Sequence, residues 1–180
     1  MRVRLFVALE LPDPVRDALV TWRGPVLSRH PGLRPVAPDS LHVTLCFLGT
    51  RSEDEVSPIA ALVGRVSGED PVRLRVGEGI WLPRRRPRVL GVTLVDEGDG
   101  LARVQSALSR GLEEGGWYEP EERPFLPHVT VARVRARERI RPDELPETPG
   151  LPFDGSRVTL FRSRPGRGGA QYEPLATVAI

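Results

Sequence analysis

The chain has 180 residues, of which 39% are hydrophobic and 28% are charged. This length and composition suit a folded domain with a buried core and do not favour intrinsic disorder. The formal net charge is only +2, so attraction to nucleic acid would have to come from local patches of charge. No apolar run is long enough to cross a bilayer, and Glu10 and Pro12 interrupt the apolar start too early for a signal peptide. We therefore expect a cytoplasmic protein.

Two features of the composition limit the chemistry. Cys46 is the only cysteine, so an internal disulfide and a multi-cysteine metal site are both excluded. All 26 basic residues are arginines, and the lack of lysine excludes a P-loop lysine, a pyridoxal Schiff base and a lysyl-adenylate. Arginine instead offers a planar guanidinium that is suited to phosphate.

The chain opens with a predicted strand and helix. The apolar run Arg4–Leu9 is typical of a buried strand, and Asp13 followed by Pro14 is typical of a helix start with Asp13 as the N-cap. Apolar residues then recur at helical spacing as far as Val26, although Pro25 should kink or shorten this helix.

A second strand and a second helix follow. The strand Leu41–Leu48 is expected to stop at Gly49. Ser52–Glu55 has the pattern of a capping box, which predicts a helix from that point. In the alternative that the sequence leaves open, Ser57 caps the helix and Pro58 opens it.

The second half of the chain predicts more strands than helices. One helix is indicated by apolar residues spaced from Leu101 to Leu112, and it should end near Gly115. The expected strands are Val72–Val76, Val89–Val95, His128–Val134, Arg157–Arg162 and Leu175–Ile180, with Arg141–Pro152 as a loop. Strands and helices do not alternate regularly, which favours an α+β fold over a doubly wound parallel sheet.

A weak internal repeat is the most informative feature of the sequence. Leu41–Leu45 reads LHVTL, and Pro127–Val131 reads PHVTV. Each copy accompanies a helix of similar character. Two lobes related by a pseudo-twofold axis, facing each other across a cleft, would explain the repeat.

Strand alternation predicts how each copy presents its side chains, because successive residues point to opposite faces. One face should carry His42, Thr44 and Cys46, while Val43, Leu45 and Phe47 enter the core. The second copy should place His128, Thr130 and Ala132 on one face and Val129 and Val131 on the other. The imidazole and the hydroxyl would then lie roughly 7 Å apart, a suitable scale for a phosphate. Carboxylates form no spaced cluster around the histidines, so we do not expect a hydrolytic metal site.

With these motifs the sequence resembles the 2H phosphoesterases, and in particular their bacterial and archaeal RNA 2′,3′-cyclic phosphodiesterase branch, also called 2′-5′ RNA ligases. The resemblance extends over almost the whole chain, through Arg4–Leu9, Leu41–Leu45, Phe47–Gly49, Arg86–Leu90, Arg123–Arg133, Leu160–Ser163 and Tyr172. It implies one bilobal α+β domain over residues 1–180, in which each lobe has an antiparallel-rich sheet and outer helices. Both motifs would face a central cleft, and the family uses no metal or cofactor. Cys46 and Gly91 depart from the usual pattern and affect expectations for RNA contact only.

The resemblance also implies roles for four residues. His42 would donate a proton to the leaving 3′-oxygen, and His128 would accept a proton from the attacking water. Thr44 and Thr130 would hold the non-bridging oxygens of the phosphate, and the product would be a 2′-phosphate. The reverse reaction would form a 2′-5′ linkage. The residues alone do not tell the two histidines apart, because the motifs are nearly equivalent.

Other residues are candidates for substrate contacts. Arg133 could reach the phosphate or form a salt bridge at the rim. Arg86 and Arg88, in the arginine-rich loop that also contains Arg84 and Arg85, could contact the RNA backbone or remain solvated. Phe6 could stack on a base, although a phenylalanine in an apolar strand is more often part of the core.

The expected partner is RNA with 2′,3′-cyclic phosphate ends, such as tRNA fragments. We expect a monomer that binds no membrane, no metal and no cofactor. A second hypothesis replaces RNA with a small cyclic nucleotide or an ADP-ribose cyclic phosphate. A third is a non-catalytic RNA-binding module, which would bind in a salt-sensitive way without turnover.

Overall fold

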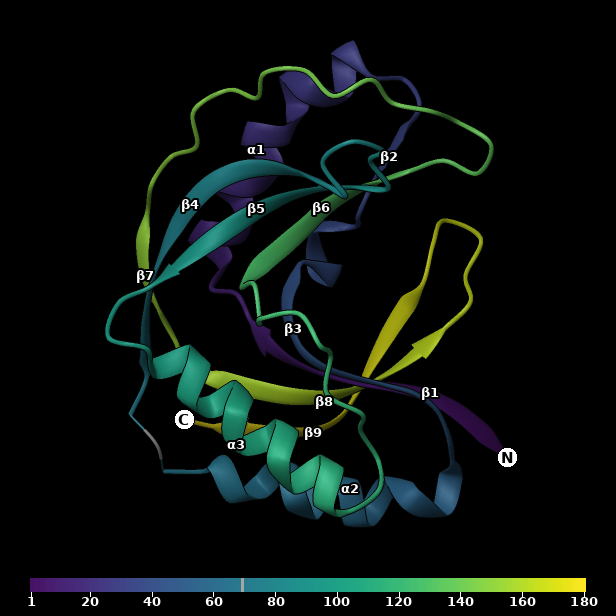
Figure 1. Cartoon of the computed structure of the whole chain (residues 1–180), viewed down its shortest axis with the longest axis vertical. Helices are drawn as coiled ribbons and strands as arrows, with labels where there is room; N and C mark the ends of the chain where they lie inside the picture. Colours follow the sequence, from purple (N-terminus) through teal and green to yellow (C-terminus); the bar gives the residue numbers. More distant parts are fainter. Residues whose placement is uncertain (69) are drawn as a thin grey trace.

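A single antiparallel sheet forms the centre of the molecule (Figure 1). The computed structural model describes residues 1–68 and 70–180, and nine strands lie within them. The strands are β1 (Arg2–Glu10), β2 (Leu33–Pro35), β3 (His42–Ser52), β4 (Val72–Leu82), β5 (Val89–Asp96), β6 (His128–Val134), β7 (Pro152–Gly155), β8 (Arg157–Arg164) and β9 (Gln171–Ala179). Their order across the sheet is β7-β4-β5-β6-β3-β1-β8-β9, and β2 pairs with β6. The α+β class expected from the sequence is confirmed.

The helices lie outside the strongly curled sheet (Figure 1). They are α1 (Asp13–Arg29), α2 (Val56–Val63) and α3 (Gly100–Glu114), with short 3₁₀ turns η1 (Pro38–Ser40), η2 (Glu53–Glu55) and η3 (Gly64–Val66). Helix α1 packs near β6 and β2, whereas α2 packs on β8 and β9 and contacts α3. Each half of the sheet therefore has its own helical cover.

The two halves of the sheet meet at a single residue pair. Strands β3 and β6 are joined through Val43 opposite Val129, the central residues of the two repeated motifs. We expected a separate sheet for each lobe, whereas one sheet runs through both halves. The repeated motifs therefore lie side by side in the middle of the molecule.

Both motif strands carry a β-bulge directly after the threonine. Along β3, Val7 pairs with Cys46 and Ala8 with Thr44, which leaves Leu45 as the extra residue. Along β6, the pairing of β5 with Ala132 and then Thr130 leaves Val131 as the extra residue. An extra residue reverses the side-chain alternation beyond it. The same irregularity thus occurs at the equivalent position of both motifs.

The bulges correct the prediction from alternation. Cys46 and Ala132, expected on the face of the histidines, are fully buried. Phe47, expected in the core, is 46% exposed, and Arg133 is also exposed. Burial raises the pKa of Cys46 to about 12, so its thiol stays protonated at neutral pH.

Side chains from the helices donate hydrogen bonds to the carbonyl groups of both bulges, and the Val131 carbonyl also accepts the Val36 N–H. Arg23 of α1 donates to the carbonyl of Val131 at 2.8 Å and to that of Val36 at 2.6 Å. Gln105 of α3 donates to the carbonyl of Leu45 at 3.3 Å. Arg23 is only 6% exposed, and its burial lowers the pKa of the guanidinium. The helices therefore brace the two irregular points of the sheet.

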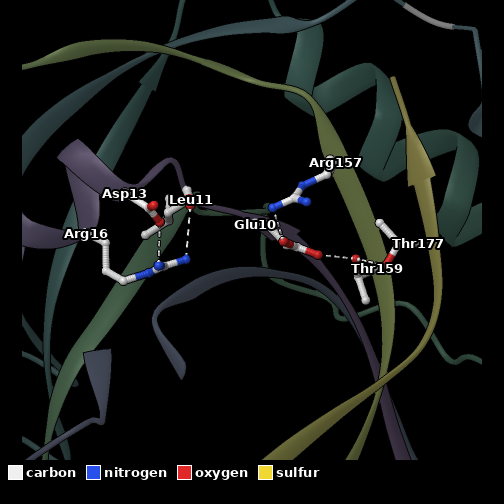
Figure 2. Close-up of polar contacts among 7 residues, drawn as sticks. All are labelled: Glu10, Leu11, Asp13, Arg16, Arg157, Thr159 and Thr177. Carbon is white, nitrogen blue, oxygen red and sulfur yellow. Dashed lines mark hydrogen bonds and ion pairs between the residues drawn. The ribbon is translucent and has the colours of Figure 1, made fainter. Parts of the chain in front are cut away.

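Figure 2 shows how the end of β1 is fixed next to this region. The carboxylate of Glu10 accepts a hydrogen bond from the buried Thr159, at 2.5 Å, and forms an ion pair with Arg157, at 2.8 Å. On the helix side, Arg16 donates to the Leu11 carbonyl at 3.3 Å. Because Glu10 pairs with His42 across β1 and β3, these contacts fix the backbone beside the first histidine.

Several element boundaries differ from the sequence prediction. Strand β3 continues past Gly49 to Ser52: Gly49 has a φ of +70° next to a register shift that leaves Leu48 as an extra residue, and β3 still pairs with β1 from Gly49 to Ser52. Helix α1 has Pro12 as its N-cap, starts at Asp13 and continues through Pro25. Strands β2 and β7 were not expected. The capping box at Ser52 is confirmed, since its N–H donates to Glu55 Oε2 at 2.7 Å.

We predict that Arg23→Met lowers the free energy of unfolding by about 2 to 3 kcal/mol, because two buried carbonyls lose a charged donor. Urea unfolding measures the change. Arg29→Met on the same helix is the control, since Arg29 forms an exposed ion pair with Asp143 and should change stability by less than about 1 kcal/mol. Equal effects of the two substitutions would contradict the bracing role of Arg23.

Candidate active site

The two motif histidines have matching hydrogen bonds. His42 Nδ1 lies 2.8 Å from the carbonyl oxygen of Ser40, and His128 Nδ1 lies 2.8 Å from that of Leu126. A carbonyl oxygen only accepts hydrogen bonds, so Nδ1 carries the proton in both rings. Each Nε2 is therefore the nitrogen that is left for proton transfer.

The register of the sheet brings the four motif side chains together. Val43 lies opposite Val129 in an antiparallel pair. Continued by one residue in each direction, this register places His42 opposite Thr130 and Thr44 opposite His128. Opposed residues of antiparallel strands lie about 4.5 to 5.5 Å apart. The four residues therefore form a compact group on one face of the sheet.

Aromatic rings surround His42. The ring of Phe6 lies 4.9 Å from the imidazole and that of Tyr172 lies 5.3 Å away with its edge towards it. Phe161 stacks on Phe6 at 5.3 Å. His42 Nε2 also lies 3.0 Å from Thr44 Oγ1. The imidazole is thus fixed on both nitrogens and packed between rings.

Burial lowers the pKa of His42 from 6.5 to about 4. The carbonyl of Ser40 opposes this change, while the positive charges of Arg133 and His128 add to it. The imidazole of His42 is therefore neutral at pH 7 in the free protein. Arg133 and His128 lie near enough to His42 to affect its pKa. This agrees with a single site that contains all three residues.

A groove of about 1100 Å³ opens beside His42 and Thr44. Among the described residues that line it are six arginines and no aspartate or glutamate; the arginines are Arg2, Arg4, Arg34, Arg133, Arg162 and Arg164. A groove with this lining attracts anions. It continues from the histidine along β1, β3 and the hairpin of β8 and β9.

Of the residues proposed for substrate contacts, some line the groove and others do not. Arg133 lines the groove together with His42 and Thr44, because the bulge at Val131 turns it towards that face. His128 and Thr130 adjoin this region through the β3–β6 pair but are not among the groove-lining residues. Arg86 and Arg88 are exposed on the loop after β4 and are not among the groove-lining residues.

Phe6 lines the groove but is packed as a core residue, the alternative that the sequence favoured for it. Its side chain is only 3% exposed, which leaves too little of the ring for a base to stack on. It packs against His42 instead. Sequence reasoning did not single out Phe47 or Arg162, which line the groove, because the bulge that exposes Phe47 depends on the pairing with β1.

Two observations concern metals and membranes. Within residues 1–68 and 70–180, no three His, Cys, Asp or Glu side chains are grouped so that they could hold a metal ion. In the same part of the chain, no helix has the length and apolar character needed to span a bilayer.

Comparison with known proteins identifies the family. A family model of the 2′-5′ RNA ligase superfamily matches residues 11–167. This chain belongs to that superfamily. The resemblance inferred from the repeated motifs is thereby confirmed.

Two relatives of known name match over 90% and 96% of their length. The chain is 35% identical to the RNA 2′,3′-cyclic phosphodiesterase of Thermus thermophilus, over 99% of this chain and 90% of that protein. It is 31% identical to the RNA 2′,3′-cyclic phosphodiesterase of Escherichia coli K12, over 98% and 96%. Among solved structures, the Thermus thermophilus protein TT0787 superposes with a TM-score of 0.85 at 33% identity, covering 98% of this chain and 97% of that one. Escherichia coli LigT complexed with 3′-AMP gives a TM-score of 0.79 at 28% identity and covers 100% and 99%.

We predict that Gly91→Ala shifts the backbone at Val129 and so changes the surroundings of the neighbouring His128. A Cβ at Gly91, which lies opposite Thr130, would approach the Val129 carbonyl to 3.2 Å and His128 Cδ2 to 3.6 Å. The imidazole signals of His128 in an NMR spectrum should shift. Gly24→Ala in α1 is the control, because nothing lies within 4 Å of its added Cβ; it should leave those signals in place. Unchanged His128 signals in Gly91→Ala would contradict the close fit.

We also predict that an NMR titration of His42 gives a pKa near 4, and that inorganic phosphate raises it, because an anion favours the charged imidazole. The unfolded chain takes up this proton near pH 6.5, whereas folded His42 takes it up only near pH 4. Stability should therefore fall as the pH drops from about 6.5 towards 4. This fall should be smaller in His42→Asn. A His42 that titrates near 6.5 in the free protein would contradict the burial argument.

Proposed function

We propose that this chain is an RNA 2′,3′-cyclic phosphodiesterase, which opens a cyclic phosphate at an RNA end to leave a 2′-phosphate. The named activity of its relatives in Escherichia coli and Thermus thermophilus supports this assignment. The observation that carries it is the matched pair of imidazoles. Each presents Nε2 and is fixed through Nδ1 by a carbonyl oxygen, beside a groove lined by arginines.

The proposed reaction divides proton transfer between the two histidines. His128 Nε2 accepts a proton from water as the water oxygen attacks phosphorus. The bond from phosphorus to the 3′-oxygen breaks, and His42 donates the proton that this oxygen needs. Thr44 and Thr130 donate hydrogen bonds to the non-bridging oxygens, where negative charge increases in the transition state.

The low pKa of His42 adds a condition to this scheme. The imidazole is neutral in the free protein, so the proposed donor has to gain its proton before it can act. The cyclic phosphate carries a negative charge, and its binding beside His42 favours the protonated imidazole. The substrate itself therefore helps to prepare the acid that cleaves it.

The proposal also covers the domain organisation, the oligomeric state, the cellular location and the substrate. Residues 1–180 act as one catalytic domain of two lobes, as a monomer in the cytoplasm, on RNA ends such as those of tRNA fragments. The reaction uses no metal or cofactor. When a 5′-hydroxyl replaces water as the nucleophile, the same step joins its oxygen to the phosphorus of the cyclic end, releases the 3′-oxygen and forms a 2′-5′ linkage. Without ATP, the extent of this reaction depends on concentrations.

The length of the groove favours RNA over the alternative substrates. It continues from His42 to Arg2 and Thr50, beyond what a small cyclic nucleotide or an ADP-ribose cyclic phosphate needs. A binding module without activity would have no use for two imidazoles with the same fixed tautomer. We therefore rank RNA hydrolysis first.

The proposal predicts the fate of a short RNA with a 2′,3′-cyclic phosphate, incubated with the protein in EDTA. Phosphorus NMR should show a 2′-phosphate. His42→Ala and His128→Ala should each lower kcat/KM by roughly 10²- to 10⁴-fold, and Thr44→Val and Thr130→Val by roughly a hundredfold.

His30→Asn provides the control for this experiment, because His30 is the third histidine of the chain and does not line the groove. It should retain the activity of the original protein. A 3′-phosphate product would reverse the leaving group that we assign. Activity that is lost in EDTA and restored by a metal would overturn the metal-free mechanism.

A further inference from the structure

Phe47 is an exposed aromatic residue on the floor of an arginine-lined groove. It is 46% exposed and is one of the few large hydrophobic side chains that reach the surface of the described residues. It lies on β3 beyond the bulge at Leu45, and therefore on the same face as His42 and Thr44. The catalytic scheme above gives it no role.

Arg4 places a positive charge directly against this ring. Its guanidinium carbon lies 4.8 Å from the ring centroid of Phe47, a distance typical of a cation–π contact. No carboxylate of the described residues forms an ion pair with Arg4, whereas Arg162 and Arg164 are paired with Glu173. Arg4 thus keeps its charge available to an anion in the groove.

The position of Phe47 separates it from the surroundings of the reacting phosphate. Phe6, Phe161 and Tyr172 already enclose His42. Phe47 lies five positions further along the strand, one of which is taken up by the bulge, which corresponds to roughly 13 Å. An occupant of the groove at Phe47 is therefore a more distant part of the substrate.

We propose that Phe47 and Arg4 form a binding site for the RNA chain on the 5′ side of the terminal nucleotide. An upstream base stacks on Phe47, and Arg4 contacts the phosphate that precedes or follows it. Stacking on an aromatic ring accepts any base, and arginine reads only the phosphate. The site therefore selects for chain length and not for sequence. This inference rests on the proposed function and specifies its substrate as an oligonucleotide.

The test compares two substrates on the full-length protein. One is a nucleoside 2′,3′-cyclic phosphate, and the other is a pentanucleotide that ends in the same cyclic nucleotide. The readout is the ratio of kcat/KM for the pentanucleotide to kcat/KM for the mononucleotide. Phe47→Ala should lower this ratio roughly tenfold, since loss of one base stack has about that effect. Phe47→Tyr should preserve it, because the ring is kept.

Two further variants make the result specific. Arg4→Gln should reduce the salt dependence of kcat/KM for the pentanucleotide, because one phosphate contact is lost. Val95→Ala changes an exposed hydrophobic residue outside the groove and should leave the ratio as it is. Circular dichroism checks that each variant is folded.

The outcomes separate this inference from the proposed function. If the unmodified protein opens both substrates but Phe47→Ala leaves the ratio unchanged, the upstream site is wrong and the phosphodiesterase assignment stands. If the unmodified protein opens the mononucleotide at least as efficiently as the pentanucleotide, the site does not act on chain length. If it opens neither substrate, the proposed function fails, and with it the inference.

Discussion

The site depends on two β-bulges at equivalent positions of two neighbouring strands. Each bulge places one extra residue, Leu45 or Val131, directly after a motif threonine. The extra residues are buried, and their carbonyl oxygens need hydrogen-bond donors there. A helix side chain donates to each, Gln105 in one half and Arg23 in the other, and the Val131 carbonyl also accepts the backbone N–H of Val36 at 3.0 Å. The helices thus fix the strand irregularities that decide which side chains face the groove.

Small residues beside the threonines complete this arrangement. Ala8 pairs with Thr44 on β1, and Gly91 pairs with Thr130 on β5. A larger side chain at either position would occupy the surface next to a threonine hydroxyl. Gly91 is a departure from the family pattern noted in the sequence, and the structure gives it a physical meaning: a Cβ there would press on the Val129 carbonyl at 3.2 Å. Each motif threonine therefore has a small residue as its partner on the neighbouring strand.

The sequence predicted the family and the two histidine–threonine pairs better than it predicted the residues around them. Alternation placed His42 with Thr44 and His128 with Thr130 because both pairs precede the bulges. It failed for Cys46 and Phe47, since a bulge is a property of two paired strands and leaves no periodic signal in either one. Strands β2 and β7 were missed for a related reason. Each is short and contains a proline, and each forms a strand only because it pairs with an adjacent strand. The carbonyl partners of the two imidazoles were also not predicted, because every residue type has the same backbone carbonyl and the sequence does not mark which one accepts the bond.

The environment of His42 explains how nearly identical motifs could take different roles. The two imidazoles share the same tautomer and the same kind of carbonyl partner at Nδ1, so these bonds do not distinguish them, although His42 Nε2 also lies 3.0 Å from Thr44 Oγ1. The aromatic rings do, because Phe6, Phe161 and Tyr172 enclose His42 and burial makes its charged form unfavourable. Such a residue gains a proton most readily when an anion lies next to it. In the proposed mechanism, the asymmetry between the halves of the sheet therefore links protonation of His42 to the binding of a phosphate, so that the acid forms next to the substrate.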